Sequence, residues 1–231
     1  MRAGRVTIRG VTVVWWAAPV VPESAPALVP LLDAHERERL ARFRRPADAA
    51  RYLAAHALVR LTLAEVVGRA PAALVFDRTC RCGAQHGKPV LPGGPGFSLT
   101  HAGDLVGVAV HPAGPVGLDV EQVRELTDLE AMTAHVCSPH ETAPDAQAFF
   151  TLWTRKEALL KAAGTGLAAP MSAITLGPSG VLDWVGEDAP TDPAWLRDLH
   201  PAPGYRAAVA GFGAEPVVTE RAGDDLLAQA R

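Results

Sequence analysis

The chain of 231 residues has only three cysteines, no long apolar run and nearly balanced charge. Three cysteines in a chain this long do not predict a disulfide framework and agree with a reducing cytoplasm. The formal net charge of −3 gives no general attraction to nucleic acid or to an acidic membrane surface. The apolar run VTVVWWAAPVVP is short and ends in prolines, so we expect a buried strand there and neither a signal peptide nor a membrane span.

Several common site motifs are also missing from the sequence. It contains no Walker-type loop, dinucleotide fingerprint or nucleophile elbow. Cys80, Cys82 and His86 lack a fourth ligand at a zinc-binding spacing, so zinc is not predicted. The chemistry therefore has to come from other side chains.

Hydrophobic periodicity and turn residues predict alternating strands and helices. The helices end at glycines or prolines that follow the periodic stretch, such as Gly68 and Gly164. A polar C-terminal tail is expected to fray. The predicted strands are 11–16, 97–101, 105–110, 116–121, AITL and YRAAVAGF, and the predicted helices are 47–67, about 127–135 and 147–163.

Two carboxylates lie in the predicted strand 116–121 (VGLDVE). Strand alternation puts Asp119 and Glu121 on one face, together with Gly117. Such a pair fits a hard cation such as Mg²⁺, and it also fits a solvated sheet face with arginine ion pairs. The residues alone leave both interpretations open.

The helix 147–163 carries Phe149, Trp153, Glu157 and Lys161 at four-residue spacing along one stripe. Glu157 and Lys161 can form an ordinary helix pair, but a surface pair does not require aromatic residues on the same stripe. Glu157 is therefore a candidate third carboxylate for the cation.

Taken together, several stretches resemble the 4′-phosphopantetheinyl transferases, most closely those of the surfactin-synthetase type. These stretches are HGKP (86–89), FSLTHAGD (97–104), VGLDVE (116–121) and LWTRKEALLKAAGTGL (152–167). They have the order and spacing of that family, and the resemblance runs from about residue 31 to 176. The carboxylate strand followed by the W-x-x-K-E-x-x-x-K helix is its specific part.

The resemblance implies an enzyme of the holo-[acyl-carrier-protein] synthase type, which transfers the phosphopantetheine of coenzyme A to a serine of an apo acyl or peptidyl carrier protein. It assigns Asp119, Glu121 and Glu157 to Mg²⁺, with Asp119 and Lys161 counted among the catalytic groups. Lys161 would face the phosphates, and Lys156 would lie beside them. Glu157 is the expected base for the serine proton, with Glu141 in reserve.

The resemblance also implies a subsite for the 3′-phosphate and adenine of coenzyme A. Thr100 and His101 match a Ser-His pair that holds the 3′-phosphate, while Lys88 and Pro89 match the segment lining that pocket. From the basic segment 37–51 we expect Arg39 and Arg51 to contribute. Glu36 and Tyr52 stand where relatives often carry Lys and Thr.

The expected fold is α+β, with two pseudo-symmetric halves that each contain a small antiparallel sheet and a long helix. The first half, residues 1–112, would take the nucleotide side of coenzyme A, and the second, 113–231, the Mg²⁺ site and catalytic helix. Coenzyme A would lie between the halves, and the chain would be monomeric, as its own pseudo-dimer. Carrier docking beside 122–141 would use Leu126, Leu129 and Met132, unless these belong to the core.

Two other functions remain open from the residues. A Mg²⁺-dependent phosphohydrolase would use the same carboxylates with water as the nucleophile. A non-catalytic module would bind coenzyme A or a carrier protein without transfer. Retention of Asp119, Glu121, Glu157 and Lys161 speaks against such a binding module.

Overall fold

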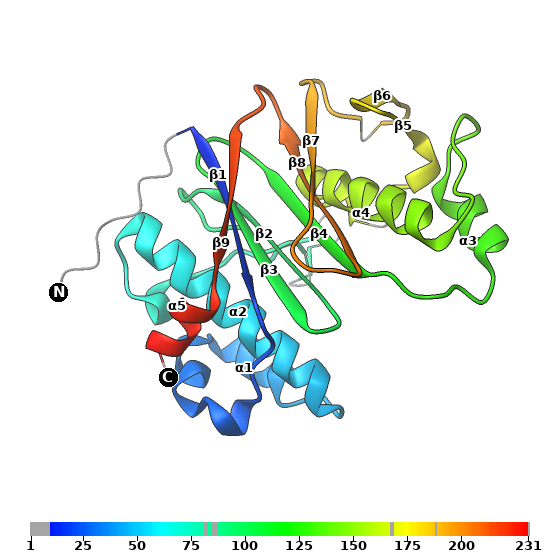
Figure 1. Cartoon of the computed structure of the whole chain (residues 1–231). Coiled ribbons are helices and arrows are strands. Elements are labelled where there is room, and N and C mark those ends of the chain that lie inside the picture. The colour runs from blue at the N-terminus through cyan, green and yellow to red at the C-terminus, as the bar shows by residue number, and fades with distance from the viewer. Residues whose placement is uncertain (1–9, 81–82, 85–86, 167–168, 188, 231) are drawn as a thin grey trace. The chain divides into compact units, whose positions relative to one another are not determined.

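The chain forms two units, seen in a computed structural model that describes residues 10–80, 83–84, 87–166, 169–187 and 189–230 (Figure 1). Unit 1 comprises Met1–Ala113 and Pro216–Arg231, and unit 2 comprises Gly114–Glu215. Each unit contains a small sheet and one long helix, which confirms the expected α+β class.

The sheet of unit 1 has the strand order β2-β3-β1-β9. Strand β1 pairs antiparallel with β3 and parallel with β9, while β2 pairs antiparallel with β3. The sheet is therefore mixed and not purely antiparallel as expected. Its strands are β1 (Val11–Ala17), β2 (Gly96–Ala102), β3 (Leu105–His111) and β9 (Val217–Ala222).

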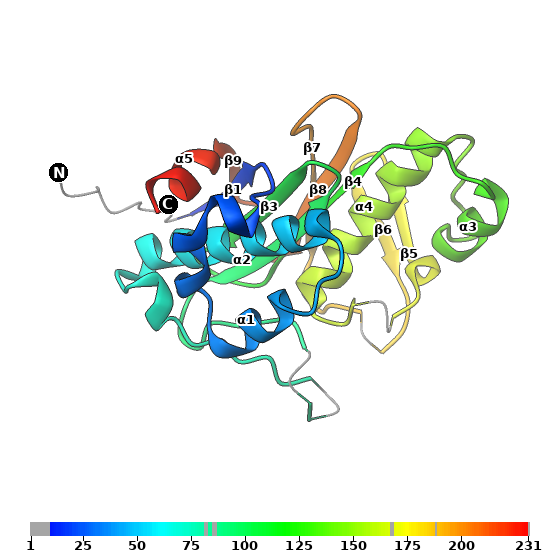
Figure 2. The same cartoon turned by 90° about the horizontal axis from the view of Figure 1, so that it is seen from below.

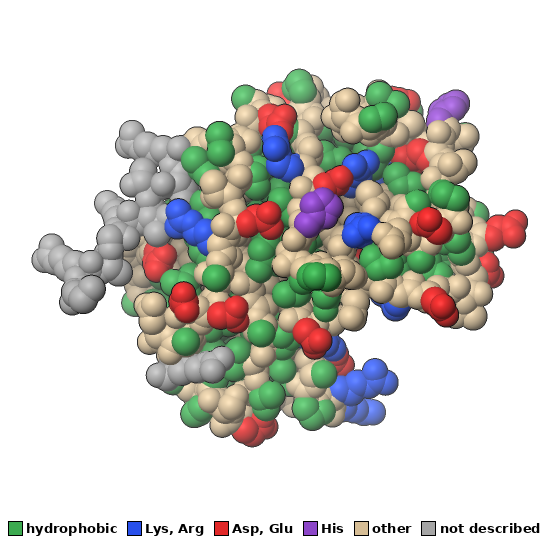
Figure 3. Space-filling model, viewed as in Figure 1, with side chains coloured by type: hydrophobic (Ala, Val, Ile, Leu, Met, Phe, Trp, Pro, Cys, Tyr) green, Lys and Arg blue, Asp and Glu red, His purple; other side chains and the backbone are tan. Residues whose placement is uncertain are grey.

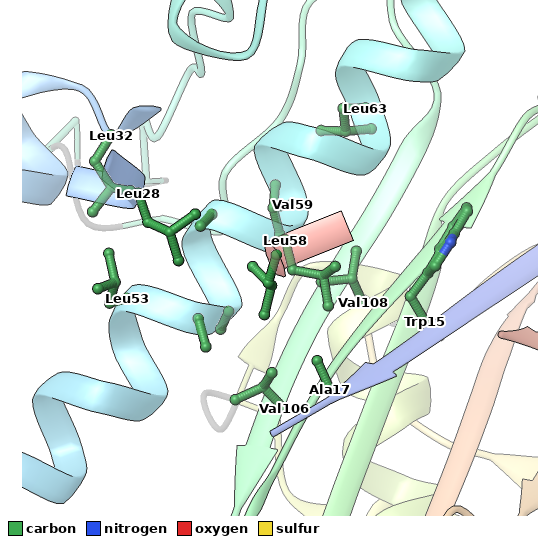
Figure 4. Packing of buried hydrophobic residues seen from close by; sticks show 14 of the residues in the cluster. Trp15, Ala17, Leu28, Leu32, Leu53, Leu58, Val59, Leu63, Val106 and Val108 are labelled. Carbon is green, nitrogen blue, oxygen red and sulfur yellow. The ribbon is translucent and has the colours of Figure 1, made fainter. Parts of the chain in front are cut away.

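Helix α2 (Pro46–Val67) forms the centre of the core of unit 1. It starts with proline at its first position and ends at Gly68, whose φ of 70° is the left-handed conformation that favours glycine. Figure 2 shows the helix between β3 and the segment that carries α1 (Ala34–Leu40). Leu58 and Leu63 are fully buried there (Figure 4).

Both sides of α2 are covered by apolar residues. Val106 and Val108 of β3 and Trp15 of β1 belong to the same buried cluster as Leu28 and Leu32, which come from the segment around the 3₁₀ helix Pro26–Leu31 (Figure 4). Burial on two sides explains why α2 is apolar around much of its circumference.

The C-terminal segment was expected to fray and to belong to the second half, and the structure differs on both points. Strand β9 pairs with β1, and helix α5 (Asp224–Gln229) buries Leu227 in the core of unit 1. The amide of Gly223 donates to the carbonyl of Trp16. These long-range contacts hold a segment whose local sequence is polar.

Unit 2 is built on a three-stranded antiparallel sheet in the order β4-β8-β7. Helix α4 packs against β4 and β8, and a hairpin of β5 and β6 completes the unit together with α3. The elements are β4 (Val116–Gln122), α3 (Leu129–Val136), α4 (Ala146–Ala163), β5 (Ile174–Gly177), β6 (Gly180–Trp184), β7 (Ala194–Leu199) and β8 (Tyr205–Phe212).

Charged side chains of both signs are interspersed on the face drawn in Figure 3, and neither sign forms a continuous field there. This agrees with the small net charge of the sequence. Within the described residues, no helix combines the length and apolar character needed to cross a membrane.

Candidate active site

Strand β4 and helix α4 approach each other closely at Gly117. A Cβ atom at this position would lie 1.8 Å from the carbonyl oxygen of Ala158 and 2.6 Å from the amide nitrogen of Ala162. Both contacts are to helix backbone, which cannot move aside as a side chain can, so only glycine fits. The absence of a side chain at Gly117 lets the backbone of α4 pack directly against β4. Asp119 and Glu121 are on the same strand face as Gly117, so this face lies against α4.

Lys161 of α4 reaches Asp119 of β4 across this contact. Its Nζ donates to Asp119 Oδ1 at 2.6 Å and to the carbonyl oxygen of Leu118 at 3.1 Å. The side chain of Asp119 is 7% exposed, whereas that of Lys161 is 29% exposed. The ammonium group is thus accessible to solvent while its carboxylate partner is almost covered.

The three carboxylates of the predicted set influence one another electrostatically. Burial raises the pKa of Glu157, and Asp119 and Glu121 raise it further, against the opposing charge of Lys161. Burial likewise raises the pKa of Glu121, to which the charge of Asp119 adds. The structure therefore brings Asp119, Glu121, Glu157 and Lys161 together, as the strand and helix patterns predicted.

The chemistry of this donor set fits Mg²⁺, since carboxylate oxygens are its preferred protein ligands. Mutual repulsion among the three groups is what a bound divalent cation relieves. In the described part of the chain, no three Asp, Glu, His or Cys side chains already form a metal cluster. Asp119 instead holds the ammonium of Lys161.

Lys156 was expected beside the phosphates and Glu141 as a reserve base, but the two side chains pair with each other in a buried position. The Nζ of Lys156 donates to Glu141 Oε2 at 2.5 Å and to the carbonyl oxygen of Val136 at 2.7 Å. Its side chain is 0% exposed, and that of Glu141 is 4% exposed. Burial lowers the pKa of Lys156, although Glu141 opposes this shift. An ammonium enclosed in this way cannot contact a phosphate, so the structure does not support the expected role of Lys156.

Glu141 is equally occupied. Besides Lys156, it accepts hydrogen bonds from the amides of Ser138 and Leu176, both at 2.7 Å. A carboxylate with three donors in a covered position joins segments of unit 2 and is not accessible to a substrate hydroxyl. This removes the reserve candidate for the base.

The apolar residues considered for carrier docking also have structural roles. Leu126, Leu129 and Met132 are partly buried and pack against the core cluster of unit 2. Of the two interpretations that the sequence left open, docking surface or core, the structure supports the core. Cys82 and His86, considered for zinc, lie outside the described residues.

Unit 1 contains a pocket of about 600 Å³ beside α1 and α2. Three of the residues predicted for coenzyme A line it, namely Arg39, Pro89 and His101. Arg42 and Arg78 add two further cations to its wall. The pocket is thus large enough for a nucleotide moiety and has a basic lining.

Three other predicted residues are not among those that line the pocket. Arg51 donates to Asp48 at 2.5 Å and to the carbonyl oxygen of Gly103 at 3.0 Å. Thr100 is buried, and strand alternation points it to the face opposite His101. Lys88 stands between two lining residues, Gly87 and Pro89.

A buried charge network next to the pocket was not predicted from the sequence. Glu36 accepts from His56 Nδ1 at 3.1 Å, Arg60 Nε at 2.7 Å and Arg78 Nη2 at 2.9 Å. Burial acts to raise the pKa of Glu36, but the hydrogen bonds and charges of His56 and Arg60 outweigh it and lower this pKa to about 2. The only signal in the sequence was that Glu36 stands where relatives often carry Lys.

Carboxylates that fit a divalent cation, a lysine and a basic pocket are typical parts of enzymes that handle phosphate esters. A profile of the 4′-phosphopantetheinyl transferase superfamily matches residues 115–210, and a profile of the 4′-phosphopantetheinyl transferase N-terminal domain matches residues 18–113.

Individual relatives agree with these profiles. The 4′-phosphopantetheinyl transferase HetI of Nostoc sp. is 35% identical over 222 residues, which cover 87% of this chain and 89% of that protein. The transferase Sfp of Bacillus subtilis is 24% identical over 202 residues, covering 83% of this chain and 87% of Sfp. The chain therefore belongs to the 4′-phosphopantetheinyl transferase superfamily.

Proposed function

We propose that this protein transfers the 4′-phosphopantetheine group of coenzyme A to a serine of an apo acyl or peptidyl carrier protein and releases 3′,5′-ADP. The observation that carries the proposal is the contact of β4 with α4 at Gly117, which places Asp119, Glu157 and Lys161 in one electrostatic cluster. Family membership supports our assignment of the transfer to this cluster.

Asp119, Glu121 and Glu157 would hold Mg²⁺ in this cluster. When bound, the ion would reduce the negative charge of the coenzyme A diphosphate, so that an oxygen nucleophile can approach it. Lys161 would leave Asp119 for a phosphate oxygen, since its side chain already has access to solvent. This lysine then offsets charge that develops during the transfer.

Glu157 would accept the proton of the carrier serine. The serine oxygen forms a bond to the β-phosphorus of coenzyme A, and the bond from that phosphorus to the bridging oxygen breaks. The electron pair leaves with 3′,5′-ADP, and the proton is held on the carboxylate of Glu157. The position of Glu157 beside Asp119 and Lys161 supports its role as the base. The alternative base, Glu141, is already paired with Lys156.

The pocket of unit 1 would bind the 3′-phosphate and adenine of coenzyme A. Arg39 and His101 are its proposed phosphate ligands, and both line the pocket. Pro89 would contact the base, and Lys88 remains a candidate beside it. A phosphate with nearly two charges requires such cationic donors, since a neutral pocket could not desolvate it cheaply.

We expect the reaction to take place in the cytoplasm, where the three cysteines would remain reduced. We also expect one chain to be the functional unit, because both halves of the family pattern lie on it. Neither nucleic acid nor a membrane is a proposed partner.

The test is mass spectrometry of an apo carrier protein incubated with coenzyme A, Mg²⁺ and this protein. We expect the carrier to gain the mass of one phosphopantetheine and 3′,5′-ADP to appear in equal amount. A carrier whose serine is replaced by alanine, and a reaction with a chelator, are the controls. Phosphate release without carrier modification would indicate a phosphohydrolase, and binding without any product would indicate a binding module.

A further inference from the structure

Two elements of unit 1 supply neighbouring parts of the pocket wall. Tyr52 and His56 come from α2, whereas Leu99 and His101 come from β2. The helix and the strand are far apart along the chain. The position of His101 relative to the helical wall therefore depends on the contacts that join α2 to the end of β2.

Strand β2 ends in a tight turn shortly after His101. Ala102 pairs with Leu105 of β3, so that only Gly103 and Asp104 form the loop. Gly103 has a φ of 53°, and a positive φ at the first loop position is typical of a type II′ hairpin turn. The carbonyl group of this first loop residue lies outside the ladder of the hairpin, so its donor has to come from elsewhere.

Arg51 of α2 provides that donor. Its Nη1 donates to the carbonyl oxygen of Gly103 at 3.0 Å. Its Nη2 donates to Oδ1 of Asp48, which stands three residues earlier in the same helix, at 2.5 Å. The side chain of Arg51 is 22% exposed. The guanidinium thus joins the first turns of α2 to the β2–β3 turn, and Asp48 holds it in the orientation that reaches this turn.

The hydrogen bond to Gly103 acts close to the residues that face the pocket. Arg51 directly precedes Tyr52, and Gly103 follows His101 by two residues, while Tyr52 and His101 both line the pocket. A turn without this bond has more conformations, and a ligand that needs His101 in one place has to select among them. A turn that is already held in place avoids this cost, which raises affinity.

We infer that Arg51 is a positioning residue, which places His101 for the 3′-phosphate of coenzyme A through the carbonyl group of Gly103. This inference rests on the proposed function, because it takes coenzyme A as the ligand of the pocket. It replaces the direct phosphate contact that the sequence predicted for Arg51. Both of its Nη atoms are engaged within the protein, by Gly103 and by Asp48.

The test is a double-variant cycle measured by isothermal titration of coenzyme A into the wild type, Arg51→Met, His101→Ala and the combined variant. Methionine keeps an unbranched side chain but has no donor for Gly103. We expect Arg51→Met to weaken coenzyme A binding about three- to tenfold, which corresponds to the loss of one ordinary hydrogen bond. In the combined variant it should add less than about twofold to the effect of His101→Ala, because the residue to be positioned is then absent.

Dephospho-coenzyme A separates positioning from a general loss of structure. Its affinity should stay within about twofold in Arg51→Met, since it lacks the phosphate that His101 binds. Arg51→Lys keeps a donor for Gly103 and should recover part of the affinity for coenzyme A. Arg197→Gln is the control, because this exposed arginine pairs with Glu215 in unit 2 and should leave both affinities unchanged.

Full addition of the two losses in the combined variant would overturn the inference, because Arg51 would then act independently of His101. Equal losses for both ligands in a folded Arg51 variant would overturn it as well. If Arg51→Met does not fold, Asp48→Asn takes its place in the cycle, since it weakens the anchor of Arg51 with a smaller change. A wild type that prefers coenzyme A to its dephospho form but fails to modify a carrier would overturn the proposed function and not the role of Arg51.

Discussion

Two lysines of helix α4, Lys156 and Lys161, each pair with a carboxylate, but their surroundings differ completely. Lys156 and Glu141 are enclosed, and Glu141 has two further backbone donors. Lys161 is partly exposed, and its partner Asp119 shares the site with two more carboxylates. The first pair is complete in itself and holds segments of unit 2 together. The second has an excess of negative charge and is suited to receive a cation.

This difference leads to opposite expectations for mutations. In the enclosed pair, a lost partner leaves a buried charge behind and should reduce stability. In the open cluster, a lost carboxylate reduces repulsion among like charges, so that stability should change little while activity is lost.

Asp119→Ala should abolish carrier modification. Asp119 is the proposed Mg²⁺ ligand from β4 that also binds Lys161. Mass spectrometry of the carrier measures the product. Thermal unfolding should show a free energy within about 1 kcal/mol of the wild type, because the repulsion of Asp119 from Glu121 and Glu157 disappears together with its ion pair to Lys161. Full activity in saturating Mg²⁺ would remove Asp119 from the site.

Glu157→Gln should lower kcat by about 10²- to 10⁴-fold, which is the usual contribution of a general base. The amide keeps the shape of the side chain but cannot take the serine proton. Affinity for coenzyme A, measured by titration, should change far less. If affinity collapsed while turnover of the remaining complex stayed normal, Glu157 would be a binding residue only.

Lys156→Met should reduce the free energy of unfolding by about 3–5 kcal/mol, because Glu141 would become an unpaired buried charge. Denaturant unfolding measures this loss. The double variant Lys156→Met, Glu141→Gln should recover part of it. For the folded fraction, kcat and the KM for coenzyme A should stay close to those of the wild type. A specific loss of kcat in a stable Lys156 variant would contradict the contrast between the two lysines.

His101→Ala tests the pocket of unit 1, which His101 lines. We expect the KM for coenzyme A to rise about ten- to a hundredfold, and kcat to stay within a few-fold, because one charge-assisted donor to the 3′-phosphate is lost. The KM for dephospho-coenzyme A should not change. An equal rise of both KM values would show that His101 stabilises the fold or contacts the diphosphate, and that it does not bind the 3′-phosphate.

The local patterns predicted the central elements well. Alternation placed Asp119 and Glu121 on one strand face, and four-residue spacing placed Glu157 and Lys161 on one helix stripe. Both patterns depend only on backbone periodicity. The class of the fold and the motifs of the family were also evident from the sequence, and the structure and comparisons confirm them.

Burial and ion pairing could not be predicted from periodicity, because they depend on the tertiary structure. Lys156 and Lys161 look alike in the sequence, yet Lys156 is enclosed by Glu141 and the carbonyl of Val136, which come from outside its helix. Arg78 has no periodic signal, because its partners Asp33 and Glu36 lie more than forty residues away along the chain. The C-terminal tail is ordered by its pairing with β1 at the opposite end of the sequence. The sequence by itself determined which side chains share a face of an element, because the local backbone fixes that. Only the folded chain decided which charges are enclosed and which remain open to a ligand, because burial and ion pairing depend on residues that are distant in the sequence.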